Sequence, residues 1–362
     1  MSALALALLL GLLILGHYLF WTHRFLVRSG EDETVYALTD DGWRLALGRR
    51  RPRGPARSLP VLLVHGVAAN RASLDFGLER WSLSAHLAAA GFDCFALDLR
   101  GHGASRRVKR GASRRFCFDD HLRHDVPAAL EAVRTACGKA RVLWVGHSQG
   151  GLLGMAAAAA HEDLAALVTL GSPVFFAARG PFPRLLWAGL LVTGRMSRFL
   201  ARILAPFSGY YHPPLSEIAM NPRNVPRPLY RRMLVTVVEN VSSGVLAQLA
   251  SWVATDTFAS KDGKVDYRAA LARCSQPALF VAANADRIAP PEGVEKAARI
   301  WGGTATVMRV GLAQGACCDY GHADLIFGRS APEEVFPGVR DFLVAHSLLE
   351  PPGGLPPQRR PA

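Results

Sequence analysis

A serine between two glycines stands where the sequence changes from a predicted strand to a predicted helix. The pentapeptide Gly-His-Ser-Gln-Gly ends the apolar run 141–146 and leads into an Ala- and Leu-rich, helix-prone stretch. A tight strand-to-helix turn needs small residues such as Gly146 and Gly150 on either side, because the backbone passes close to its neighbours there. Such a turn exposes the hydroxyl group at the N-terminal end of a helix, where developing negative charge is stabilised. The pattern therefore predicts Ser148 as a nucleophile; a simple helix N-cap, the alternative role, would not require both glycines.

A proton acceptor and a carboxylate follow later in the chain, in the order that a serine nucleophile of this kind requires. Asp286 comes directly after the apolar run 277–283, and His322 lies after the last predicted strand. Histidine readily exchanges a proton near neutral pH, so His322 is the candidate general base. Asp286 is the candidate acid that orients this histidine, although an aspartate at this place could instead cap the next helix. Asp319 and Asp324 are the other carboxylates near the histidine.

Two backbone N–H groups are expected to hold the negative charge that develops when a serine attacks a carbonyl group. One belongs to Gln149, the residue after the predicted nucleophile, and the other to the loop that follows the strand 59–66. Val67 is the candidate for the second donor. Gly66 lets a substrate approach the backbone closely, and His65 is expected to brace this loop rather than to react.

Short apolar runs without polar alternation indicate strands that are buried on both faces of a sheet. Ala- and Leu-rich helical stretches separate most of these runs, so we expect an α/β fold with a doubly wound, mostly parallel sheet. A β-hairpin with its turn at Asp40-Asp41-Gly42 precedes them. The runs are 59–66, 92–99, 141–146, 166–171, 277–283 and 305–311.

The alternation of strands and helices is interrupted by a long segment that is rich in Arg, Phe, Trp and Leu and is punctuated by prolines. We interpret this segment, residues 174–273, as a helical lid inserted into one α/β core. The core then consists of residues 33–173 and 274–348. Residues 349–362 are rich in Pro and Gly and have the composition of a disordered tail.

Residues 3–21 form an almost continuous apolar stretch, and about 20 such residues suffice to cross the hydrocarbon core of a bilayer. A cleaved signal peptide would start with a basic residue and end in small ones, whereas this stretch has no charged side chain before it and ends in bulky residues. Arg24 and Arg28 follow it, and the positive-inside rule then places the rest of the chain in the cytoplasm. We therefore predict a single-pass membrane anchor; a secretory signal and a core helix are the alternatives.

The 362-residue chain is strongly basic, with 42 Lys and Arg against 29 Asp and Glu and a net charge of +13. No motif of a nucleic-acid-binding fold accompanies this charge, so an anionic membrane surface is the expected partner and a nucleic acid is not. Half of the residues are hydrophobic, which excludes a largely disordered chain. The six cysteines show no CxxC spacing, so we expect free thiols in the cytosol, and we expect neither a metal nor a cofactor.

Three motifs occur in the order seen in the α/β-hydrolase superfamily, which this chain resembles. They are HGxxxN at 65–70, DxRGHG at 98–103 and GHSQGG at 146–151. The segment YGHADLIFG at 320–328 is similar to the C-terminal catalytic loop of acid lipases and of polyhydroxyalkanoate synthase-like hydrolases. The polyester synthases carry Cys where this chain has Ser148, which disfavours polymerase activity. The resemblance covers the predicted core and leaves the predicted lid unmatched.

The resemblance implies that Asp98, Arg100 and His102 organise loops rather than react. Together with the predicted triad it implies hydrolysis of carboxylic esters, lipid-like ones above all, through an acyl-enzyme on Ser148. An apolar lid and a membrane anchor suit an acyl chain. Acyl transfer is an alternative because it shares every step up to the acyl-enzyme. A non-catalytic protein that binds lipids or partners on the same scaffold is another, and it would require a damaged triad.

Overall fold

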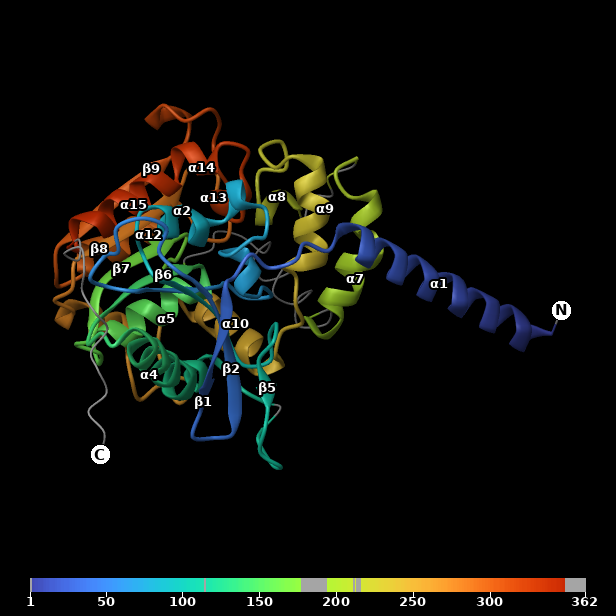
Figure 1. The fold of residues 1–362 in the computed structure, drawn as a ribbon, viewed down its shortest axis with the longest axis horizontal. Helices are drawn as coiled ribbons and strands as arrows, with labels where there is room; N and C mark the ends of the chain where they lie inside the picture. Colours follow the sequence, from blue (N-terminus) through green and yellow to red (C-terminus); the bar gives the residue numbers. More distant parts are fainter. Residues whose placement is uncertain (1, 114, 177–193, 211, 213–215, 349–362) are drawn as a thin grey trace.

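The computed structural model describes residues 2–113, 115–176, 194–210, 212 and 216–348 (Figure 1). Within these residues, nine strands form one sheet in the order β1-β2-β4-β3-β6-β7-β8-β9, with β5 paired to β2. The first strands pair antiparallel, and all pairs from β4 through β3 to β9 are parallel. The strands are β1 (Glu33–Leu38), β2 (Trp43–Arg50), β3 (Val61–Val64), β4 (Cys94–Asp98), β5 (Arg106–Arg107), β6 (Val142–His147), β7 (Leu164–Leu170), β8 (Ala278–Ala283) and β9 (Ala305–Val310).

Helices cover both faces of the sheet, because its central strands are apolar on both sides. Alternate residues of β3 belong to different cores: Leu62 and Val64 pack with α4 (Val126–Cys137), α5 (Gln149–Ala158) and α12 (Pro291–Ile300). Val61 and Leu63 pack on the other face with α2 (Leu83–Ala89) and α15 (Phe336–Ala345). This two-residue alternation follows from the pleat of a strand. The sheet and its two helical layers form the body of the molecule (Figure 1).

The expected α/β fold with a doubly wound, mostly parallel sheet is confirmed. Each of the six apolar runs coincides with a strand to within two residues at either end, and the expected hairpin pairs β1 with β2 through a turn in which Gly42 has a φ of 95°. Two local features carried no recognisable pattern. The short strand β5 pairs with β2, and residues His121–Asp125 form a π-helical turn before α4.

The segment between β7 and β8 forms helices where the structure describes it. They are α7 (Ser197–Leu204), α8 (Ser216–Ala219), α9 (Arg227–Thr236), α10 (Ser243–Thr255) and α11 (Tyr267–Ala270). We call residues 174–273 the insertion. Residues 177–193 of the predicted lid and the whole of the predicted disordered tail, residues 349–362, lie outside the described residues.

Helix α1 (Ala3–Phe25) projects away from the body and is apolar and long enough to cross a membrane (Figure 1). None of its residues is buried, but one face of its last turns touches the insertion. The Nε2 of His17 lies 3.0 Å from the carbonyl oxygen of Ile203, and the ring of Phe25 lies under the guanidinium of Arg231. Just after the helix, the N–H of Val27 donates to the Oγ1 of Thr236 over 3.0 Å.

Candidate active site

Ser148 occupies the sharp turn between β6 and α5. Its φ of 53° and ψ of −117° lie where a residue with a Cβ is strained, and such strain is typical of functional positions. Gly146 and Gly150 have no room for a side chain, because a Cβ on Gly146 would collide with the backbone of Gly150, and one on Gly150 with the carbonyl of Val64. Both glycines are thus required to form the turn that places the serine at the head of α5.

Two contacts fix the backbone of Ser148 against the end of β7. Its N–H donates to the carbonyl oxygen of Leu170 over 2.8 Å, and its own carbonyl accepts a 2.8 Å hydrogen bond from the Oγ of Ser172. Ser172 is fully buried. The serine that the sequence singles out is therefore held by a second serine that no motif marks.

Asp286 and His322 form a hydrogen-bonded pair. Asp286 Oδ2 lies 2.7 Å from the Nδ1 of His322, and both side chains are buried. The other carboxylate oxygen of Asp286 accepts the N–H groups of Ile288 and Ala289 over 2.8 and 2.7 Å. With one oxygen fixed by the backbone, the other is aimed at the imidazole. Asp286 therefore orients the ring so that its Nε2 remains available.

Gly171 and His147 bring this pair to the serine. Gly171, with a φ of 59°, follows the strand end that binds Ser148, and a Cβ on it would lie 3.1 Å from both Asp286 Oδ2 and His322 Nδ1. His147 precedes the serine, its ring lies 4.8 Å from that of His322, and its Nε2 lies 3.2 Å from the His322 carbonyl oxygen. A carbonyl oxygen only accepts, so Nε2 of His147 carries the hydrogen. Ser148, Gly171 and Asp286 thus follow the carboxyl ends of the neighbouring strands β6, β7 and β8, and His322 is hydrogen-bonded to Asp286 there.

The predicted oxyanion donors lie on either side of Ser148. Gln149 is the first residue of α5, and N–H groups in the first turn of a helix have no partner within it. A Cβ on Gly66 would lie 3.0 Å from the Cβ of Ser148, so the loop carrying Val67 passes directly beside the serine. Within the described part of the chain, no backbone hydrogen bond uses the N–H of Val67 or Gln149. Both donors are available to a ligand.

Both ring nitrogens of His65 bind the backbone of neighbouring loops. Its Nε2 accepts the N–H of Leu99 over 3.2 Å, so its Nδ1 carries the hydrogen and donates to the carbonyl of Gly66 over 2.8 Å. This holds the ring away from the serine. The next residues tie the loop to the insertion, because the carbonyl of Ala68 accepts the N–H of Glu239 over 2.9 Å and Asn70 Nδ2 donates to the carbonyl of Thr236, also over 2.9 Å.

The two other carboxylates near His322 are occupied elsewhere. Asp324 is fully buried and accepts the N–H of Gly321 and of Asn221, each over 3.0 Å, together with the side-chain amide of Asn224 over 2.9 Å. Burial raises the pKa of Asp324, and this effect outweighs the hydrogen bonds, which by themselves lower it. Asp319 accepts the N–H of Leu312 over 2.9 Å. Asp324 therefore anchors the histidine loop to the insertion, and Asp286 is the acid that reaches the imidazole.

The DxRGHG segment organises loops, as the resemblance implies. Asp98 is buried and accepts the N–H groups of Arg71 and Ala104, each over 2.8 Å. The guanidinium of Arg100 bridges Asp125 and Asp41, at 2.8 Å and 2.6 Å. These contacts fasten the ends of β4 and the β1–β2 turn to the helix before α4.

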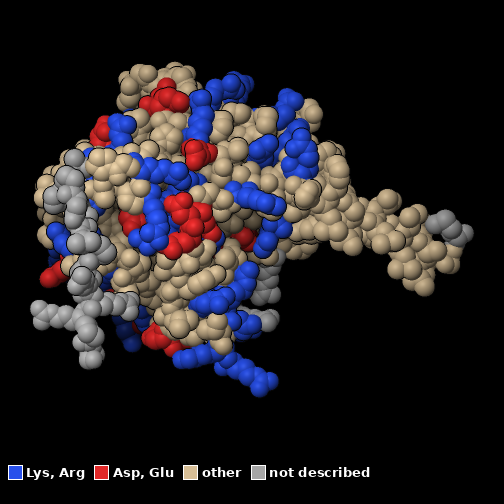
Figure 2. Space-filling model, viewed as in Figure 1, with Lys and Arg blue, Asp and Glu red and all other residues tan. Residues whose placement is uncertain are grey.

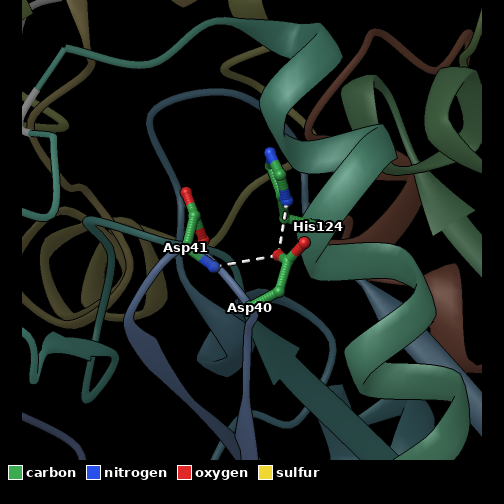
Figure 3. Close-up of side chains that lie close together, drawn as sticks. All are labelled: Asp40, Asp41 and His124. Atoms are coloured by element: carbon green, nitrogen blue, oxygen red, sulfur yellow. Dashed lines mark hydrogen bonds and ion pairs between the residues drawn. The ribbon is translucent and has the colours of Figure 1, made fainter.

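Asp40, Asp41 and His124 form a second group of titratable side chains at the β1–β2 turn (Figure 3). The Nδ1 of His124 lies 2.6 Å from an oxygen of Asp40, and Asp41 is already paired with Arg100. Although burial favours its neutral form, hydrogen bonds from Arg100 and Thr39 lower the pKa of Asp41. These contacts secure the β1–β2 turn, whereas Ser148 lies in the turn after β6.

Several residues of the site escape sequence reasoning. Ser172, Gly171 and His147 support the triad, but they stand in segments whose only visible feature is small size or the variable position of the pentapeptide. Asn221 and Asn224 hold Asp324 from the insertion, about a hundred residues away in the chain. The one available signal was the tripeptide Gly-Ser-Pro at 171–173, directly after a buried strand. Small residues at such a place indicate that another segment passes close to the backbone.

Buried histidines predict a loss of stability in acid. Burial lowers the pKa of His102 to about 4 and that of His147 to about 3, and it lowers the pKa of His65 well below its usual range. A histidine in the unfolded chain has a pKa of about 6.5, so below that pH the unfolded chain binds more protons than the folded one. Each group's contribution to the free energy of unfolding is fully present above this pH and falls by about 1.4 kcal/mol per pH unit in acid.

A comparison of wild type with His147→Gln isolates one of these groups, because the glutamine amide can still donate to the His322 carbonyl. Urea unfolding in detergent at stepwise lower pH should show the wild type losing stability more steeply than the variant, by about 1.4 kcal/mol per pH unit below about pH 6.5. Burial raises the pKa of three aspartates, Asp75, Asp98 and Asp324, and these groups make the fold more stable as the pH falls. Their contribution is the same in the wild type and in the variant, so it cancels in the difference between the two slopes. Equal slopes would contradict the prediction.

The fold and the arrangement of these residues agree with a known family. A model of the family described as alpha/beta hydrolase fold matches residues 60–314, well over half of the chain. The chain belongs to this family. The match includes Ser148 and Asp286 of the α/β-hydrolase but ends before His322, so the place of the histidine rests on its hydrogen bond with Asp286.

Relatives of this α/β-hydrolase include lipases. Human lysosomal acid lipase/cholesteryl ester hydrolase is 31% identical over 153 residues, which are 40% of this chain and 37% of that enzyme. Human gastric triacylglycerol lipase is 29% identical over 147 residues, 37% of this chain and 36% of that enzyme. The chain thus spans little more than a third of the length of these relatives. An esterase from Thermogutta terrifontis shares the fold with a TM-score of 0.57 at 21% identity, covering 87% of this chain and 99% of that one.

Proposed function

We propose that this α/β-hydrolase cleaves carboxylic esters through an acyl-enzyme on Ser148. The observation that carries the proposal is the 2.7 Å contact between Asp286 and His322 beside a serine held in the strained turn at the start of α5. Nucleophile, base and orienting acid are the three parts of a serine-hydrolase triad. No cofactor or metal enters the proposed reaction.

In the proposed reaction, Ser148 Oγ attacks the acyl carbonyl carbon while Nε2 of His322 takes the hydroxyl proton. The N–H groups of Val67 and Gln149 hold the resulting oxyanion. The bond to the alcohol oxygen then breaks, and His322 gives its proton to this leaving group. Water then attacks the acyl carbon while His322 takes one of its protons. The bond to Ser148 Oγ breaks, His322 returns the proton to this oxygen, and the carboxylic acid leaves. Asp286 stabilises the imidazolium in both halves.

Lipid-like esters are the proposed substrates. The names of the human relatives, a cholesteryl ester hydrolase and a triacylglycerol lipase, support this class. The apolar helix α1 supports it too, because an enzyme attached to a bilayer meets esters with long acyl chains there. We propose that the insertion serves as the lid over the acyl chain.

A covalent probe tests the nucleophile. We expect a fluorophosphonate to label the full-length protein at one residue, Ser148, because an activated serine attacks phosphorus as it does carbon. Peptide mass spectrometry identifies the residue. The matched control is Ser172→Ala, which removes the neighbouring buried hydroxyl and should still be labelled. Labelling of another serine, or none in folded protein, would refute the assignment.

We further propose that α1 is a single-pass anchor with the catalytic domain in the cytoplasm. Its apolar length and the arginines that follow it support this topology. In cells, the protein should stay with membranes through carbonate extraction, and its catalytic domain should resist protease added to intact cells. Recovery of a secreted protein that lacks these first residues would show that the segment is a signal peptide.

A further inference from the structure

A patch of exposed apolar side chains lies on one short segment of the insertion. Within the described surface of helix α7 and the 3-10 turn η5 (Ala205–Phe207), Leu204 is 54% exposed, Phe207 is 63% exposed and Tyr210 just beyond is 70% exposed. Met196 and Phe199 add to it. Large apolar residues on soluble surfaces are usually scattered singly, and a group of them indicates a binding surface. We call these five residues the α7–η5 face.

The α7–η5 face is fixed against the last turns of α1. The ring of Phe199 stacks on that of Tyr18 at 5.6 Å, and the ring of Phe207 stacks on that of His17 at 5.8 Å. The guanidinium of Arg202, which lies between them in the sequence, donates to the hydroxyl of Tyr18 over 2.9 Å. Phe199 and Phe207 therefore lie at the same level along the axis of α1 as Tyr18 and His17.

This level is the boundary of the bilayer if α1 spans it. Crossing the hydrocarbon core takes about 20 residues, so nearly the whole apolar stretch 3–21 is needed for the crossing and Trp21 lies at the boundary of the core. Tyr18 lies about three residues, or about 5 Å of helix, before Trp21, in the outermost part of the hydrocarbon core and next to the interfacial layer. Aromatic residues favour this layer. Because Phe199 and Phe207 stack on residues of that level, they must enter the same layer beside the helix.

Basic side chains surround the apolar surface. The guanidinium groups of Arg227 and Arg231 lie 4.3 and 4.8 Å from the ring of Tyr210, and Arg24 and Arg28 are exposed at the end of α1. Figure 2 shows Lys and Arg gathered around the base of α1, while the projecting helix carries no charge. In a phospholipid leaflet the charged phosphates lie just outside the apolar acyl chains. The apolar residues and the arginines outside them have the same arrangement.

We propose that the α7–η5 face docks into a phospholipid bilayer as a second attachment beside α1, with the arginines on lipid phosphates. The proposal rests on the proposed membrane span and goes beyond it. Thr236 at the end of α9 connects α1 with the active-site loop. Its hydroxyl oxygen accepts the N–H of Val27, and its carbonyl oxygen accepts the side-chain amide of Asn70. The docked insertion is thus hydrogen-bonded to the loop that carries Val67, so docking fixes the position of the active site relative to the leaflet.

Fluorescence quenching by lipids tests the docking in the full chain. The background is Cys137→Ser/Cys317→Ser/Cys318→Ser, because these three cysteines are at least partly exposed, whereas Cys94, Cys117 and Cys274 are buried and give little labelling. An environment-sensitive NBD label is placed singly by Leu204→Cys or Phe207→Cys, and in α1 by Leu13→Cys. Leu38→Cys is the matched control, since Leu38 is an equally exposed apolar residue on β1. The proteins are reconstituted in phosphatidylcholine–phosphatidylglycerol vesicles with lipids spin-labelled near the top of the acyl chain, which reach positions 204 and 207, and near its end, which reach position 13.

We expect the labels at positions 204, 207 and 13 to lose most of their fluorescence to the spin-labelled lipids, and the label at position 38 to lose none. Quenching at position 13 without quenching at 204 and 207 would overturn the docking and leave the membrane span intact. No quenching at position 13 would overturn the span, and the docking with it. Activity toward a soluble short-chain ester, measured on the same samples, verifies that each labelled protein is folded.

Discussion

Ser148→Ala should lower ester turnover by at least about a thousandfold, because the change removes the oxygen that forms the acyl-enzyme and leaves only binding and oxyanion stabilisation. The fold should tolerate the change, since the strained turn is held by Gly146, Gly150 and the backbone contacts of Ser148 rather than by its hydroxyl. Steady-state kinetics with a soluble chromogenic ester measures the loss, and the melting temperature verifies folding.

The control for this variant is Ser172→Ala. It deletes the hydrogen bond to the carbonyl of Ser148, and one such bond is worth about 1 kcal/mol. We expect this variant to be somewhat less stable and to retain turnover within about tenfold of the wild type, as 1.4 kcal/mol corresponds to one factor of ten. Wild-type-like turnover by Ser148→Ala would remove the serine from the mechanism altogether.

Asp286→Asn should lower turnover nearly as strongly, by about three to four powers of ten. The amide would present an N–H to Nδ1 of His322 where the carboxylate now accepts one. The ring would then carry its hydrogen on Nε2, the nitrogen that must take the proton from Ser148. The same kinetics, with the enzyme normalised to the concentration of folded protein, measures this loss.

Asp324→Asn is the comparison that locates the acid. Asp324 accepts N–H groups from Gly321, Asn221 and Asn224, so the amide would place a donor against donors and destabilise the fold by about 1–3 kcal/mol. Turnover per folded molecule should remain close to that of the wild type. The opposite ranking, with Asp324→Asn the less active variant, would move the orienting role to Asp324.

The residues that could be predicted from the sequence are those whose role depends on residues next to them in the chain. Ser148 was recognisable because the strand, the glycines and the helix are its immediate neighbours, and the apolar runs marked the strands because burial on both faces removes polar alternation. Asp286 was placed by its position after such a run. Its 2.7 Å contact with His322 follows from two parallel strands ending at one edge, which the fold class already implied.

Contacts between distant segments were not predictable in this way. Nothing in the sequence around Thr236 indicates that it meets both Val27 and Asn70, because a hydrogen bond of this kind needs only a hydroxyl and a carbonyl, which are common. The packing of His17 and Tyr18 on the insertion was not predictable from the sequence either. In a stretch that is apolar on all sides, hydropathy alone does not reveal which face touches protein.

The end of α1 is packed against the body rather than joined to it by a loose linker, and this changes how the enzyme would find its substrate. If α1 spans a bilayer as proposed, the contacts of Phe25 with Arg231 and of Val27 with Thr236 keep the catalytic centre at a fixed height above the leaflet. Its search is then two-dimensional, and the rate is set by the number of ester molecules per unit area of membrane. Adding more vesicles of the same composition would leave the rate per enzyme unchanged, whereas enriching the leaflet in ester would raise it.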